Sequence, residues 1–282
     1  MDPLGLSSGV RTAGREPSTH CIVCFGDSIT RGYGLPEGRS WPSLLEAALR
    51  AREDGGAWIV VNAGVPGDTI LQGLARLERD VLSHHPDVAF IAFGINDAHL
   101  ARRKTDVYRE QALWEDVQCR PWRKAIVEMG VTRHLRPYWR RLRSPSRDAG
   151  MATLHPEPIP RVSLPAFRRA LEVIVERLRE ARPGIYLFLV TPTPITEHLH
   201  PEWPAELRRR QHQVFSSYVS AVREAAATLG TGLVDAYRTI AQGDMRQLVG
   251  SDGVHLTIAG QRQLAEAAYR AMAEAGLVTC KT

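Results

Sequence analysis

The hydrophobic positions along the chain fall into two patterns that alternate from one end to the other. Short unbroken apolar runs, each ending in glycine or small polar residues, predict buried parallel strands. Runs with apolar residues three and four positions apart predict amphipathic helices between them. The predicted strands cover 21–25, 58–61, 88–93, 185–190 and 232–235, and the predicted helices cover 41–52, 70–82, 164–181, 204–229 and 257–275. This alternation predicts an α/β domain on a parallel sheet with right-handed crossovers.

The alternation is interrupted once, by a long insertion after the third predicted strand that we place at 98–163. Within it we expect short helices near 108–117 and 123–129, and an irregular stretch over the proline-rich 144–160. Insertions of this length in compact domains are usually lids, binding loops or disordered segments. We therefore expect one domain over 21–278 that carries the insertion, preceded by a disordered tail over 1–20.

The composition is that of an ordinary globular protein, with 282 residues of which 44% are hydrophobic and 24% charged. No run approaches the roughly 18 apolar residues that a membrane-spanning helix needs. The first residues lack the apolar core of a secretory signal, so we expect a cytoplasmic protein whose four cysteines are reduced thiols. Cys21 and Cys24 are three apart in a strand and point to opposite faces, which favours core packing over a disulfide or a shared metal.

The net charge of +5 comes from one segment. Positions 100–147 hold thirteen Lys or Arg against five Asp or Glu, a local +8, which leaves −3 for the rest. This basic, aromatic segment could contact nucleic acid, an anionic lipid surface or an anionic substrate. We favour another interpretation, a solvated helix face with the tryptophans packed underneath it. If the insertion is a lid, we expect Trp114 and Trp122 to line an acyl or aryl pocket.

Residues with catalytic potential follow the predicted strands at their carboxyl ends. Ser28 follows the first strand, Gly67 the second and Asn96 the third, while Asp252 and His255 lie in the last loop, beyond the fifth. Open α/β sheets form their binding crevice at this edge. The sequence therefore predicts that these five residues lie around one site.

Together these residue types meet the requirements of acyl transfer. Ser28 can act as nucleophile and His255 as its base, while Asp252, three residues before the histidine, can orient the imidazole through Nδ1. The backbone N–H groups of Ser28 and Gly67 and the side-chain amide of Asn96 are the natural donors to an oxyanion. Taken singly each residue is more often a turn or capping residue, so the prediction depends on their convergence.

Two other patterns carry less weight. The Gly-x-Ser-x-Gly match at 5–9 has neither a strand before it nor a helix after it, so we reject it as a nucleophile elbow. The histidine pairs 84–85 and 198/200 have no accompanying array of Cys or carboxylates, which favours polar loop residues over a metal site.

Four segments resemble the four blocks of the GDSL, or SGNH, hydrolase family in order and spacing. They are Gly26-Asp27-Ser28, 62–69 (Asn-Ala-Gly-Val-Pro-Gly-Asp-Thr), 94–97 (Gly-Ile-Asn-Asp) and 252–255 (Asp-Gly-Val-His). The resemblance implies a flavodoxin-like three-layer α/β/α fold and hydrolysis of esters or thioesters. It also implies name-giving roles for Ser28, Gly67, Asn96 and His255, with Asp252 completing the triad and Asp27 in support. Within the second block we assign the oxyanion glycine to Gly67 rather than to Gly64.

We therefore expect a serine esterase that acts on a small-molecule ester or thioester through an acyl-enzyme, without metal or organic cofactor. Alternatives with the same triad are a thioesterase or lysophospholipase, and an acyltransferase that passes the acyl group to an alcohol or sugar. Outside enzymes, the fold could serve as a ligand-binding module, and a nucleic-acid role would require salt-dependent binding by the insertion. The natural substrate and the oligomeric state stay open.

Overall fold

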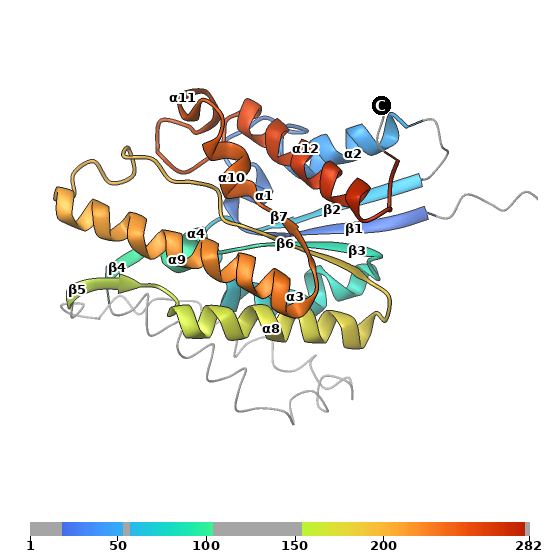
Figure 1. Cartoon of the computed structure of the whole chain (residues 1–282), viewed down its shortest axis with the longest axis horizontal. Coiled ribbons are helices and arrows are strands. Elements are labelled where there is room, and N and C mark those ends of the chain that lie inside the picture. The colour runs from blue at the N-terminus through green and yellow to red at the C-terminus, as the bar shows by residue number, and fades with distance from the viewer. Residues whose placement is uncertain (1–18, 53–56, 104–153, 280–282) are drawn as a thin grey trace, which may run out of the picture.

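A parallel sheet of five strands forms the centre of the computed structural model, which describes residues 19–52, 57–103 and 154–279 (Figure 1). The strand order is β2-β1-β3-β6-β7, and each neighbouring pair is parallel. The strands are β1 (Thr19–Gly26), β2 (Ala57–Gly64), β3 (Val88–Ala92), β6 (Tyr186–Val190) and β7 (Gly232–Val234). The predicted fold class is confirmed, and the order reverses direction between β1 and β3, where open sheets form their crevice.

Helices cover both faces of the sheet and complete three layers (Figure 1). One layer contains α2 (Trp41–Arg50), α10 (Ala236–Ala241), α11 (Met245–Leu248) and α12 (Ile258–Glu274). The other contains α3 (Ile70–Asp80), the short 3₁₀ helix η1 (Leu82–His84), α8 (Leu164–Ala181) and α9 (Ala205–Leu229). We call these the α2/α12 layer and the α3/α9 layer. One-turn helices α1 (Ser28–Arg31) and α4 (Ile95–Ala98) follow β1 and β3.

The central strands are apolar throughout because both of their faces are buried. Along β1, Val23 and Phe25 pack into the core under the α3/α9 layer, while Ile22 and Cys24 pack into the core under the α2/α12 layer. Cys21 contacts the first of these cores, so the two neighbouring cysteines lie on opposite faces of the sheet as predicted. Both are free thiols.

A second, two-stranded antiparallel ribbon pairs β4 (Leu100–Arg103) with β5 (Leu154–Pro160) at the two ends of the insertion. The prediction of an irregular stretch over 144–160 is therefore wrong for β5. The register of the ribbon shifts between Ala101 and Arg103, and prolines are tolerated in edge strands and at such irregularities. The helices expected near 108–117 and 123–129, as well as Trp114, Trp122 and residues 1–18 of the expected tail, lie outside the described residues. The prediction that the tail extends to residue 20 is wrong for residues 19–20, because they pair with β2 as the start of β1.

The strand register brings the carboxyl ends of β1, β2 and β3 to one level. Gly26 at the end of β1 pairs with Gly64 of β2 on one side and Ala92 of β3 on the other. The loops that leave these three strands therefore start side by side.

Among the described helices, none is both long and apolar enough to cross a membrane.

Candidate active site

Ser28 is the first residue of α1, at the point where β1 ends. The Asp27 carboxylate caps this one-turn helix by accepting a hydrogen bond from the Ile29 N–H at 2.9 Å. Gly32, in the left-handed conformation at φ 73°, ends the helix and returns its N–H to the Ser28 carbonyl. The chain thus turns sharply on both sides of the serine, which fixes the direction of its side chain.

The histidine turn lies opposite Ser28 and follows α11. The Asp252 carboxylate accepts from the backbone N–H groups of Val254 at 3.0 Å and His255 at 2.9 Å through one oxygen. Its other oxygen lies 2.6 Å from His255 Nδ1, and His255 Nε2 lies 3.0 Å from Ser28 Oγ. The structure therefore brings Asp252, His255 and Ser28 into one continuous chain of hydrogen-bond contacts.

The environment of Asp252 favours its charged form. Partial burial acts to raise its pKa, but the hydrogen bonds from Val254 N–H and from the imidazole and N–H of His255 outweigh burial. The pKa of the Asp252 carboxyl therefore lies below its ordinary value. A carboxylate held beside Nδ1 directs a proton to that nitrogen and leaves Nε2 to accept one from the serine.

The turn after β2 contains two glycines whose environments differ. The Gly64 N–H donates to the Asn62 side chain at 3.0 Å, and a Cβ at Gly64 would lie 2.3 Å from the Arg31 nitrogen. Gly67 has φ +81°, with open space where a Cβ would be. None of the described contacts engages its N–H, so Gly67 has a backbone donor free at this edge while the Gly64 donor is occupied.

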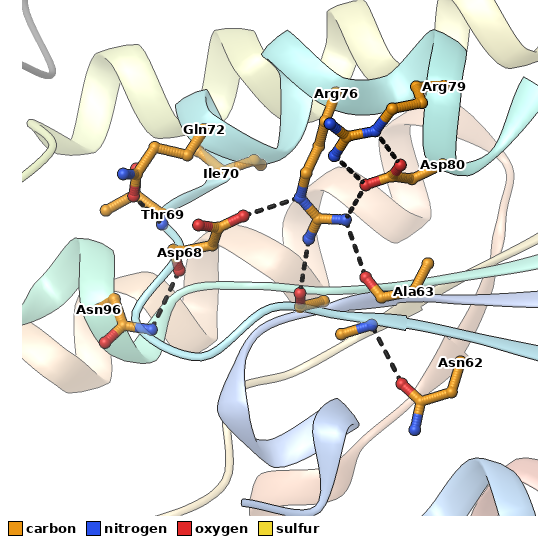
Figure 2. A network of polar contacts seen from close by, with 12 residues as sticks. Asn62, Ala63, Asp68, Thr69, Ile70, Gln72, Arg76, Arg79, Asp80 and Asn96 are labelled. Atoms are coloured by element: carbon orange, nitrogen blue, oxygen red, sulfur yellow. Dashed lines mark hydrogen bonds and ion pairs between the residues drawn. The ribbon is translucent and has the colours of Figure 1, made fainter. Parts of the chain in front are cut away.

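Asn96 lies in α4, after β3, and contacts the same turn. Its Nδ2 donates to the Asp68 backbone carbonyl at 3.0 Å (Figure 2). A primary amide has two N–H groups, and this bond uses one of them and fixes the plane of the other. Next to it, the Asp97 carboxylate accepts from the Ile70 N–H at 2.9 Å at the start of α3. These contacts hold the turn after β2 against α4.

A buried arginine, Arg76 of α3, joins the elements under the site, and our sequence analysis missed it. Only 8% of its side chain is exposed. Its guanidinium donates to the Asp68 carboxylate at 2.7 Å and the Asp80 carboxylate at 3.0 Å (Figure 2). It also donates to two strand-end carbonyls, Gly26 of β1 at 2.8 Å and Ala63 of β2 at 2.9 Å. One side chain therefore ties the ends of both strands to the turn that carries Gly67.

Asp27 is in a different environment from Asp252. Burial, followed by the nearby charge of Asp68, raises the pKa of its carboxyl to about 7, against the lowering effects of the Ile29 N–H and the Arg76 cation. A group that titrates in the neutral pH range therefore lies directly beside Ser28.

The histidine pair 198/200, which the sequence analysis interprets as polar loop residues, lies in the loop after β6. His200 stacks on Trp203 with ring centroids 4.0 Å apart and has Nδ1 3.1 Å from Glu202, in the loop after β6. Within the described ranges, no group of three or more His, Cys, Asp or Glu side chains could hold a metal ion. Trp114 and Trp122 lie outside those ranges.

Sequence comparison finds curated relatives that match part of the chain. An arylesterase from Vibrio mimicus is 43% identical over 76 residues, which is 27% of this chain and 37% of the relative. Thioesterase 1/protease 1/lysophospholipase L1 from Escherichia coli is 34% identical over 83 residues, covering 29% of this chain and 38% of the relative. The matched stretch thus spans less than half the length of these relatives.

Structure comparison extends over nearly the whole chain. A lipase/acylhydrolase from Enterococcus faecalis has a TM-score of 0.59 at 22% identity, covering 93% of this chain and 100% of that one. An acetylxylan esterase from Geobacillus stearothermophilus has a TM-score of 0.57 at 19% identity, covering 92% and 96%. These likenesses show a shared fold. A model of the GDSL-like lipase/acylhydrolase family matches residues 24–263. The chain therefore belongs to the GDSL-like lipase/acylhydrolase family.

Proposed function

We propose that this protein is a serine hydrolase that cleaves carboxylic esters through an acyl-enzyme on Ser28. The observation that carries the proposal is the chain of contacts from Asp252 through His255 to Ser28 Oγ, at 2.6 and 3.0 Å. The distance from His255 Nε2 to Ser28 Oγ is within the range in which a base can remove the proton of a nucleophile, and the distance from Asp252 to Nδ1 is that of a hydrogen bond.

In the first step Ser28 Oγ attacks the ester carbonyl while His255 Nε2 takes its proton. The imidazolium that forms is stabilised by the Asp252 carboxylate, which accepts the Nδ1–H and does not itself take the proton. The depressed pKa of Asp252 supports this role, because the carboxyl keeps its charge across the neutral range.

The carbonyl oxygen becomes an oxyanion and needs donors that are already in place. We assign this role to the N–H groups of Ser28 and Gly67 and to the second N–H of Asn96. Arg76 supports it as a positioning residue, because it binds Asp68, whose carbonyl fixes the Asn96 amide. Donors that need no reorganisation during the reaction usually make the largest contribution to such catalysis.

Collapse of the tetrahedral intermediate breaks the bond to the leaving group, whose oxygen takes the proton from His255 Nε2. Water then enters, gives its proton to the same nitrogen and attacks the acyl-enzyme. Return of that proton to Ser28 Oγ releases the carboxylic acid.

The substrate class follows from the same chemistry. We propose a small-molecule ester, and a thioester meets the same requirements, as the names of the two relatives suggest. An acceptor alcohol in place of water would make the protein an acyltransferase. Product analysis with added alcohol separates the two, because transfer would give a new ester instead of a free acid.

The test is hydrolysis of p-nitrophenyl acetate, butyrate, octanoate and palmitate, together with labelling by a fluorophosphonate probe. We expect Ser28→Ala to lose both hydrolysis and labelling, because the nucleophile is absent. We expect Asn96→Ala to keep labelling while kcat falls by about 10²–10³, the usual effect of losing one oxyanion donor.

The matched control is Ser216→Ala on α9, an exposed serine whose hydroxyl bonds only within its own helix. It should behave as the wild type. Hydrolysis by Ser28→Ala at the wild-type rate, with that variant folded, would contradict the proposal.

A further inference from the structure

A groove of about 740 Å³ opens beside the catalytic histidine turn. It lies between the segment that follows α1 and the segment that joins α11 to α12. The described residues that line it are Tyr33, Gly34, Leu35, Gln247, Gly250, Ser251, Asp252, His255, Leu256, Thr257, Ile258 and Ala259. The groove therefore starts at the imidazole and Asp252 and extends to the first turn of α12, which belongs to the α2/α12 layer.

Tyr33 forms one wall of this groove and is placed by the nucleophile turn itself. Its N–H donates to the Ser28 carbonyl at 3.0 Å, so its position depends on α1. Its ring centroid lies 5.0 Å from that of His255, with 39° between the planes. Since 56% of Tyr33 is exposed, the ring is not a core residue. An aromatic ring that contacts the base and stays open to solvent can also contact a bound molecule.

The chemistry of the site decides which part of an ester can occupy the groove. His255 must deliver its proton to the oxygen of the leaving group, so that group lies beside the imidazole when the bond breaks. Of the proposed oxyanion donors, Gly67 lies in the turn that leads into α3 of the other layer, and Asn96 lies in α4, which bonds to that turn and to the first residue of α3. The leaving group and the oxyanion therefore lie on opposite sides of Ser28, and the groove is on the side of the leaving group.

The lining limits the kind of leaving group. Besides the Tyr33 ring it contains the half-buried aliphatic side chains of Leu35 and Ile258, while Leu256 behind them is 2% exposed and belongs to the core. Among the described residues that line it, none is Lys or Arg, and its one acidic residue is Asp252. An anionic group such as a phosphate would meet a carboxylate and find no cation there.

From these observations we infer that the groove is the leaving-group subsite of this enzyme, and that Tyr33 makes it select neutral, apolar or aromatic alcohols. The inference rests on the proposed function. It separates two kinds of ester that the triad alone treats alike: those of neutral aryl or bulky alcohols, which fit the groove, and those of phosphate-bearing alcohols, which do not.

The test compares benzyl butyrate with methyl butyrate. The two esters share an acyl group and have leaving alcohols of similar basicity, so the ratio of their kcat/KM values measures the subsite. We expect Tyr33→Ala to lower the benzyl-to-methyl ratio about tenfold, the effect of losing one aromatic contact. Tyr33→Phe retains the ring, and we expect it to rescue the ratio.

Two comparisons make the result specific. Tyr186→Ala removes another exposed tyrosine, at the amino end of β6, and should leave the ratio as in the wild type. The ratio of methyl octanoate to methyl butyrate reports the acyl side, and Tyr33→Ala should not change it. If Tyr33→Ala lowers the rates on benzyl and methyl butyrate by the same factor, Tyr33 only positions His255 and the inference is overturned.

The charge argument has its own test with 4-carboxybenzyl butyrate, an anionic counterpart of benzyl butyrate. Ala259→Lys places a cation at an exposed position in the groove lining. We expect it to raise kcat/KM for the anionic ester several-fold relative to the neutral one. An unchanged ratio would overturn the assignment of the groove.

Failure of the inference and failure of the proposed function give different results. If the wild type is labelled by the fluorophosphonate and hydrolyses p-nitrophenyl butyrate, but the benzyl-to-methyl ratio ignores Tyr33, only the inference fails. If the wild type is neither labelled nor active on any ester, the proposed function fails and the inference with it.

Discussion

Two carboxyl groups near Ser28 have pKa values that shift in opposite directions. Asp252 receives three hydrogen bonds at the edge of the groove, and its pKa is lowered. Asp27 is 2% exposed, and burial raises its pKa to about 7. Asp252 therefore stays charged beside the His255 imidazole. When Asp27 is charged, its burial lowers the stability of the fold.

The cost at Asp27 predicts a pH-dependent stability. Its carboxyl titrates near 3.8 when unfolded and about 7 when folded. Between these values the folded protein holds a proton that the unfolded chain has released, so the free energy of unfolding falls as pH rises, by about 1.4 kcal/mol per unit. Asp27→Asn removes this term. We therefore expect the stability of the variant relative to wild type to increase from pH 5 to pH 8 by on the order of 2 kcal/mol.

Urea unfolding of both proteins at pH 5 and pH 8 measures this difference. Asparagine keeps an acceptor for the Ile29 N–H, so the cap of α1 survives the change. A difference in stability that is equal at the two pH values would show that Asp27 does not titrate in this range.

Arg76 shows what sequence reasoning at the scale of single residues could not find. Ser28 and Asn96 could be predicted because they are polar residues directly after predicted strands, and Asp252 and His255 because they lie three residues apart in the loop before the last predicted helix. Arg76 is a cation inside a helix, where the usual expectation is a solvated side chain. Its role depends on carbonyls of β1 and β2 that face α3 only after the sheet has formed.

At the scale of elements, the turn between β2 and α3 makes different demands on its two glycines. Gly64→Ala places a Cβ 2.3 Å from the Arg31 nitrogen and 2.8 Å from the Asp27 carbonyl oxygen, and backbone cannot easily move away. We expect a loss of about 3 kcal/mol or more. Gly67→Ala meets open space and carries only the strain of a positive φ, about 1–2 kcal/mol.

Urea unfolding and hydrolysis of p-nitrophenyl butyrate check this pair together. The clash at Gly64 falls on the turn that carries Ser28, so Gly64→Ala should also lose more activity than Gly67→Ala, which keeps its N–H. The opposite order would show that the close approach of Gly64 to Arg31 and Asp27 does not hold the turn of Ser28 in place.

Most element boundaries followed from hydrophobic spacing and capping residues. α8 covers 164–181 as predicted, with Pro165 in its first turn, and α3 begins after a Thr69 capping box. Among the elements that were not predicted, α1, α4 and β5 show the physical reasons. The one-turn helices α1 and α4 are too short to show a period, and β5 contains alternate prolines that usually argue against a strand.

At the scale of the whole molecule, each helical layer has one buried glutamine near the carboxyl ends of the strands. Gln261 of α12 accepts from the Trp41 N–H at 2.7 Å and donates to the Ile29 carbonyl at 3.0 Å. Gln211 of α9 accepts from the Leu100 N–H at 2.9 Å and donates to the Ala98 carbonyl at 3.0 Å. Gln261 thus links α1 to the start of α2, and Gln211 links α4 to the start of β4, from opposite sides of the sheet.

Two glutamines on α9 form a matched pair for testing this. Gln211 is 3% exposed, and Gln211→Met would leave a buried N–H and a buried carbonyl without partners, so we expect a loss of about 2–4 kcal/mol. Gln213 is exposed, and Gln213→Met should change the free energy of unfolding by less than about 0.5 kcal/mol. Urea unfolding distinguishes the two variants. If both changed the free energy of unfolding by the same small amount, the hydrogen bonds of Gln211 would not stabilise the fold.

The ribbon of β4 and β5 has a consequence for how the family can diversify. Because Arg103 pairs with Leu154, the chain leaves and re-enters the domain at one place. Residues gained or lost between these two positions do not change the distance that the rest of the fold has to span. A segment of a different length can therefore replace the present one at this point while the sheet and the turns around Ser28 keep their places.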